Sequence, residues 1–95
     1  MIGTRIWDKN PNMLIPYYLM FSYLYYEKNI SLIDDAEFDG MCKTLLDKLD
    51  TLTHMHKHLI KKESLTAGTG YGINYTNRIK SAAMSLTKDI LWTTN

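Results

Sequence analysis

The sequence predicts a small all-α domain, in which three main helices form one bundle across residues 1–95. Two stretches carry apolar residues at intervals of three and four, the period of a helix with one buried face. A third stretch is apolar almost all round, which is typical of a helix enclosed on several sides. No stretch has a clear strand pattern, and a chain of 95 residues suits one domain with a single modest core.

The first helix is expected to begin near Asn12 or Pro16, after an irregular lead-in over residues 1–12, and to end near Lys28. Its apolar run of about fourteen residues is too short to cross a bilayer. The run contains several tyrosines and ends in Glu27-Lys28 without a small-residue cleavage site, which argues against a signal peptide. We therefore expect no membrane association.

The second helix should begin at Asp34, which with Glu37 three residues later forms an acidic capping box. Its predicted buried stripe consists of Phe38, Cys42, Leu45, Leu49 and Leu52. The pattern can continue through Met55, Leu59 and Ile60, which predicts one helix of about 27 residues with a weak point at residues 51–53. A helix of that length with an apolar stripe would also suit a homodimer.

Residues 63–73 are expected to form a glycine-rich loop before the last helix. Such a loop can also cradle phosphate, although neither a Walker nor a Rossmann pattern is present. The last helix is predicted over residues 75–91, capped by Asn74 or Thr76, and Trp92 is expected to anchor its end. Its predicted buried stripe consists of Tyr75, Ile79, Ala82, Ala83, Leu86 and Ile90.

The charge of the chain is unevenly distributed. The net charge is +1, with −3 over residues 1–53 and +4 over residues 54–95. This lacks the strong basic excess of a dedicated nucleic-acid binder, so we expect no nucleic-acid partner. Cys42 is the one cysteine, which fits a reducing, cytoplasmic compartment, and its place on the apolar stripe predicts a buried small hydrophobe.

Residues 23–39 carry the best candidate for a binding site. The turn between the first two helices should set Tyr25 and Tyr26 opposite Asp35 and Asp39. Aromatic faces above carboxylates suit a flat, cationic, partly polar ligand. Alternatively, the tyrosines are core residues and the acids only cap the helix. Capping does not account for Asp39, which lies one turn further on.

The same stretch, Y-L-Y-Y-E-K-N-I-S-L-I-D-D-A-E-F-D, resembles the small N-terminal domain of NAD-dependent DNA ligases. That family carries a pattern close to Y-x-Y-[HY]-x-x-[DN]-x-P-x-I-x-D-A-E-Y-D, followed by a leucine-rich helix. Phe38 stands where the family has tyrosine, and Ser31 where it has proline. The resemblance implies that Tyr25, Tyr26 and Phe38 pack on the nicotinamide of NAD or nicotinamide mononucleotide, and that Asp35 and Asp39 hydrogen-bond its polar groups.

Three classes of function follow. The first is a non-catalytic module that binds the nicotinamide mononucleotide part of NAD, similar to free-standing accessory proteins of bacterial viruses. The second is a viral protein-interaction module that uses the tyrosine-rich helix to modulate a host protein in the host cytoplasm. The third, an enzyme acting on a nicotinamide nucleotide with an Asp as general acid or base, ranks last, because the sequence indicates no pair of groups with perturbed pKa values. The chain also lacks a K-x-D-G adenylation motif and the other parts of a ligase, so it is not expected to be a ligase by itself.

A cluster of histidines, His54, His56 and His58, follows Asp50 in the sequence. On a continuous helix His54 and His58 would share a face with Asp50, a spacing that suits a divalent metal. A solvated basic face with the neighbouring lysines is the interpretation we favour, and we expect no metal.

Overall fold

The computed structural model describes residues 10–68 and 72–94, the last six of these by their backbone alone. The expectations for residues 1–9, Gly70, Ile90 and Trp92 therefore lie outside the described part or concern side chains that are not described. Within the described part the order is η1 (Pro11–Met13), α2 (Leu14–Lys28), α3 (Asp35–Lys48), η2 (Leu49–Thr51), η3 (Lys57–Leu59), α4 (Lys62–Ala67) and α5 (Asn77–Thr94). Those ranges contain no strand, and the predicted all-α class is confirmed.

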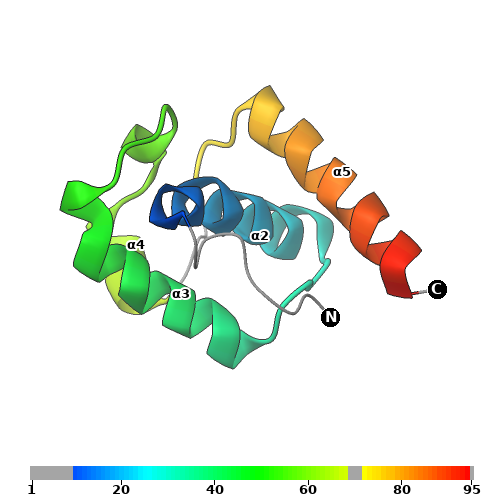
Figure 1. The fold of residues 1–95 in the computed structure, drawn as a ribbon, viewed down its shortest axis with the longest axis horizontal. Helices are drawn as coiled ribbons and strands as arrows, with labels where there is room; N and C mark the ends of the chain where they lie inside the picture. Colours follow the sequence, from blue (N-terminus) through cyan, green and yellow to red (C-terminus); the bar gives the residue numbers. More distant parts are fainter. Residues whose placement is uncertain (1–9, 69–71, 95) are drawn as a thin grey trace.

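Helix α2 is the centre of the fold. It packs against both α3 and α5, which lie on either side of it (Figure 1). Nine residues of α2, spread over its first three turns, are buried: Leu14, Ile15, Tyr18, Leu19, Met20, Phe21, Ser22, Tyr23 and Leu24. Enclosure on several sides is what its apolar composition predicts.

The turn from α2 to α3 is set by two local devices. Asn29 adopts the left-handed conformation at φ 58°, which asparagine tolerates at a helix end. The Ile30 amide then donates to the Leu24 carbonyl at 2.8 Å. At the other end of the turn, the Asp34 carboxylate accepts a hydrogen bond from the Glu37 amide at 2.7 Å. The predicted N-cap at Asp34 is therefore confirmed.

The prediction of one helix running on to Ile60 is wrong, because α3 ends at Lys48 and Leu52 is extended. The predicted weak point at residues 51–53 is where the chain turns. The Thr51 hydroxyl donates back to the Lys48 carbonyl at 2.8 Å, which competes with helical hydrogen bonding. The Asn12 side-chain oxygen accepts a hydrogen bond from the Thr53 amide at 2.9 Å. This contact with the segment before α2 fixes the path of the chain after α3.

The predicted loop over residues 63–73 is also partly wrong, since α4 occupies its first half. Leu65 is buried and gives this short helix an inner face. The helix ends at Gly68, which takes φ 71° as a left-handed C-cap. Packing against α3 stabilises a helix of six residues that would not persist alone.

Helix α5 begins at Asn77, after the predicted cap Thr76, whose hydroxyl accepts from the Ile79 amide at 3.3 Å. Ile79 and Ala83 are buried as predicted, but Ala82 is exposed. Thr87, one turn after Ala83, takes the inner position instead. In the described ranges we find no helix with the length and apolar character needed to span a membrane.

Candidate functional site

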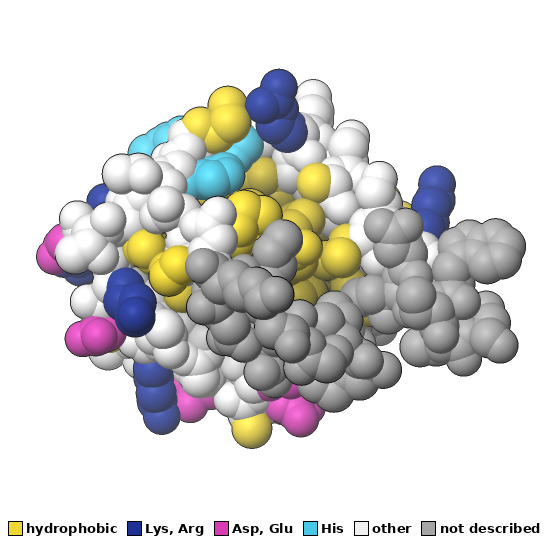
Figure 2. All heavy atoms as spheres, in the orientation of Figure 1, with side chains coloured by type: hydrophobic (Ala, Val, Ile, Leu, Met, Phe, Trp, Pro, Cys, Tyr) yellow, Lys and Arg dark blue, Asp and Glu magenta, His cyan; other side chains and the backbone are white. Residues whose placement is uncertain are grey.

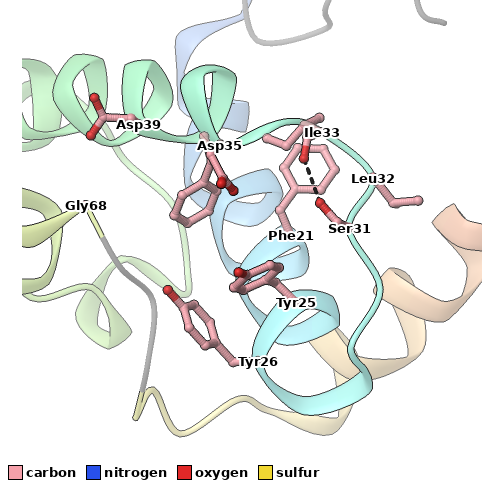
Figure 3. A pocket seen from close by; sticks show the side chains of 10 residues that line it. Phe21, Tyr25, Tyr26, Ser31, Leu32, Ile33, Asp35, Asp39 and Gly68 are labelled. Carbon is pink, nitrogen blue, oxygen red and sulfur yellow. Dashed lines mark hydrogen bonds between the residues drawn. The ribbon is translucent and has the colours of Figure 1, made fainter.

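A pocket of about 310 Å³ lies between the C-terminal half of α2 and the N-terminal turn of α3 (Figure 3). Residues of four segments line it: the end of α2, the turn after it, the start of α3, and the C-cap of α4. The lining residues are Phe21, Tyr25, Tyr26, Ser31, Leu32, Ile33, Asp35, Phe38, Asp39 and Gly68. We call this cavity the aromatic pocket.

One wall of the aromatic pocket is a cluster of rings. Tyr25 and Tyr26 meet edge to face, with ring centroids 4.8 Å apart and an interplanar angle of 88°. Phe38 stacks on the buried ring of Tyr18, at 5.7 Å and 20°. This contact fixes the Phe38 ring from behind. The Tyr25 side of the wall remains accessible, since Tyr25 is 47% exposed.

The other wall carries carboxylates. Asp35 and Asp39 come from successive turns of α3 and lie across the opening from the two tyrosines (Figure 3). Asp39 also forms an ion pair with Lys43 at 3.0 Å, one turn further on. Because both partners are exposed, this pair contributes little to stability and leaves the carboxylate free to exchange partners.

Gly68 closes the pocket on the α4 side. A side-chain carbon at this position would come within 3.0 Å of the Asp39 carboxylate oxygen. Its left-handed backbone also disfavours any other residue type. The glycine therefore permits a close approach of the α4 backbone to the acidic wall.

All five residues that the sequence marked as a candidate site line this one pocket: Tyr25, Tyr26, Asp35, Phe38 and Asp39. Their assignment to nicotinamide remains a prediction. Sequence reasoning missed five other lining residues, namely Phe21, Ser31, Leu32, Ile33 and Gly68. The alanine-glycine step at residues 67–68 was the available indication of a helix end there.

The phenol groups of Tyr18 and Tyr75 and the thiol of Cys42 are neutral at pH 7. Burial raises the pKa of Tyr18 and of Tyr75 well above the usual range for tyrosine. Burial, and secondarily the Asp39 charge, raises the pKa of the Cys42 thiol to about 11. Cys42 is fully buried, as predicted, and at neutral pH it is a protonated thiol and not a nucleophile.

The histidine cluster lies apart from the pocket, in the segment between α3 and α4. Figure 2 shows the histidines gathered at one edge of the molecule. Because the chain turns after Lys48, the continuous helical face assumed for Asp50, His54 and His58 does not form. Across the described residues, no group of three or more His, Cys, Asp or Glu side chains is placed to hold a metal ion.

Comparisons with protein-family models, curated proteins and solved structures give no match to this chain.

Proposed function

We propose that this chain is a non-catalytic binding module whose aromatic pocket takes the nicotinamide end of nicotinamide mononucleotide or NAD. The observation that carries the proposal is the collection of Tyr25, Tyr26, Phe38, Asp35 and Asp39 around one cavity. These residues come from two helices joined by a sharp turn, and they are the ones that the resemblance to NAD-dependent DNA ligases marks for this role.

The chemistry of the walls supports an oxidised nicotinamide ring. That ring is flat and positively charged, and aromatic faces attract cations by about 0.5–2 kcal/mol. Carboxylates of Asp35 and Asp39 would add Coulomb attraction and accept hydrogen bonds from the carboxamide. Reduced nicotinamide is neutral and should bind about fivefold more weakly.

The pocket suits the ring and its ribose more than a whole dinucleotide. Its volume of about 310 Å³ lies at the low end of small-molecule clefts, which span about 300–1,000 Å³. Among the described lining residues there is no lysine or arginine to receive a phosphate. The phosphate of the mononucleotide would therefore point out of the pocket, away from the two carboxylates.

Calorimetric titration with nicotinamide riboside, nicotinamide mononucleotide and NAD tests this proposal. The riboside should bind at least as tightly as the mononucleotide, because it lacks the phosphate that the acidic wall repels. Asp39→Asn should weaken binding about tenfold. The matched control is Asp47→Asn, since Asp47 is an exposed acid of the same helix that does not line the pocket.

A folded protein that takes up none of the three ligands at millimolar concentration would refute the proposal. Equal weakening by Asp39→Asn and Asp47→Asn would also contradict it, because that result would reduce the effect to net charge. Steady release of nicotinamide from NAD would point instead to the enzymatic class.

A protein-interaction module remains the second candidate function. Most tyrosines of α2 are buried or half-buried, which limits the surface that a partner could contact. Tyr18 and Tyr23 of α2 are buried, and Tyr17 and Tyr26 are half-buried. Tyr25 is therefore the tyrosine of this helix that is most accessible to a partner. For either class we propose a cytoplasmic location, supported by the single buried thiol, with a virus-infected bacterial host as the setting implied by the resemblance.

A further inference from the structure

A second hollow lies on the opposite flank of α2, between its C-terminal part and α5. Its volume is about 350 Å³. Three lysines line it, Lys28 from α2 and Lys80 and Lys88 from α5. The hydroxyl-bearing side chains of Ser81 and Ser85 lie between the two lysines of α5 along the same helix face. We call this site the lysine hollow.

The charged side chains described in the lysine hollow are all positive. Among the described residues that line it, none carries a carboxylate. The side-chain ion pairs found in the described part of the chain involve other lysines, Lys43 and Lys62. Glu27 precedes Lys28 in the sequence but does not line the hollow. Ammonium groups around one cavity repel each other, and a bound anion would remove that repulsion.

The position of Lys80 is unfavourable for helix stability, which argues that its charge has another role. The first turn of α5 contains Arg78 and Lys80 and no acid. Cations at a helix N-terminus oppose the helix dipole. The first turn of α3, in contrast, contains Asp35 and Glu37 and follows the usual preference. Local helix stability therefore explains the charges of α3 but not those of α5.

The spacing of the lysines suggests the shape of the ligand. Lys80 and Lys88 are separated by about 12 Å along the axis of α5. A chain of linked phosphates can contact these two lysines and Lys28 together, so an extended anion uses more of the hollow than a single phosphate does. Serine hydroxyls can donate to phosphate oxygens. Met84, which is 37% exposed, gives the middle of the hollow an apolar surface for a sugar or base.

We propose that the lysine hollow binds linked phosphate groups of an extended polyanion, and that single-stranded nucleic acid is the ligand that fits it. The proposal is independent of nicotinamide binding, because no residue lines both sites. It departs from the expectation drawn from net charge, since the relevant quantity is the local charge of α5 and not the total.

The test is fluorescence anisotropy of a short labelled oligothymidylate at several salt concentrations, with inorganic tripolyphosphate as a competitor. The affinity should fall with salt at a logarithmic slope of about −2, as expected for three lysine–phosphate contacts with a single strand. Lys80→Gln/Lys88→Gln should weaken binding about tenfold at low salt and reduce the magnitude of that slope by about 1.4.

The matched control is Lys48→Gln/Lys61→Gln, which lowers the net charge equally at two exposed lysines outside the hollow. It should change the affinity less than about threefold. All four lysines are exposed, so both variants should keep the helical circular dichroism of the parent.

Oligothymidylate binding that depends on Lys80 and Lys88 supports the proposal, and displacement by tripolyphosphate identifies phosphate as the recognised group. Binding of tripolyphosphate alone would support the phosphate site and overturn its assignment to nucleic acid. Absence of binding at low salt, or equal losses in the two double variants, would overturn the proposal as a whole.

Discussion

The two flanks of α2 differ in the sign of their charge and in what that charge does for the fold. On the α3 flank, acids cap the helix, follow its dipole and line the aromatic pocket. On the α5 flank, Arg78 and Lys80 lie in the first turn of the helix, against its dipole, and Lys80 also lines the lysine hollow with Lys28 and Lys88. Asp35 therefore serves both helix stability and the proposed nicotinamide site, whereas Lys80 opposes the helix dipole and its charge is accounted for by the proposed anion.

The largest difference in stability is expected from substitutions at two glycines on the α3 flank, Gly68 and Gly40. Gly68→Ala should lower the free energy of unfolding by about 1–2 kcal/mol, because alanine is strained at φ 71° and its methyl group would meet the Asp39 carboxylate. The variant should also weaken nicotinamide riboside binding and leave oligothymidylate binding unchanged. Urea denaturation and the two binding assays check these outcomes.

Gly40→Ala is the matched substitution with the opposite expectation. Gly40 lies inside α3 with open space around it, so alanine should raise stability by about 0.5–1 kcal/mol. If both variants destabilised the protein equally, the special role assigned to the Gly68 backbone would be wrong.

The features that could be predicted from the sequence are those that depend on residues close together in the chain. The cap at Asp34, the end of α2 and the grouping of Tyr25, Tyr26, Asp35, Phe38 and Asp39 were accessible because they depend on neighbours within about one or two turns. Charge reasoning from the whole chain did not reveal the lysine hollow, because its residues come from α2 and α5 and meet only in the fold.

The wrong predictions concern features that depend on contacts between residues far apart in the sequence. The turn after α3 is held by Asn12 across 41 residues of sequence, and no local pattern shows that contact. Helix α4 was missed because glycines dominate the sequence after it, while the burial of Leu65 that stabilises it is a tertiary property. Ala82 was placed inside because alanine fits either face of a helix, and only packing decides between them.

A change of intermediate size is expected when the charge of Lys80, in the first turn of α5, is reversed. Lys80→Glu should raise stability by about 0.3–1 kcal/mol at low salt, because an acid in the first turn of α5 favours the helix dipole. The same change should weaken oligothymidylate binding by about tenfold at low salt, because it lowers the charge of the hollow by two. Thermal denaturation at low and high salt measures the gain, which added salt should reduce.

Lys88→Glu is the control for this prediction, since Lys88 lies beyond the first turns of α5 and gains nothing from the N-terminal dipole. It should reduce oligothymidylate binding without stabilising the protein. A Lys80→Glu variant that is less stable than the parent would show that the lysine has a structural role, and the contrast between the flanks would lose its basis.

The smallest expected effect concerns pH and the junction between the histidine cluster and α5. The His56 amide donates to His54 Nδ1 at 3.1 Å, so that nitrogen must be unprotonated, and His56 Nε2 lies 3.4 Å from the capping hydroxyl of Thr76. Burial, and secondarily neighbouring positive groups, lower the pKa of both His54 and His56 in the folded protein. The unfolded chain therefore binds protons first, and stability present above about pH 6.5 should decline as the pH falls through that value toward 5.

Hydrogen exchange should show the first turn of α5 opening more readily at pH 5.5 than at pH 7, while α3 is unaffected. In His54→Gln/His56→Gln this pH dependence should disappear, and an unchanged profile in that variant would place its origin elsewhere.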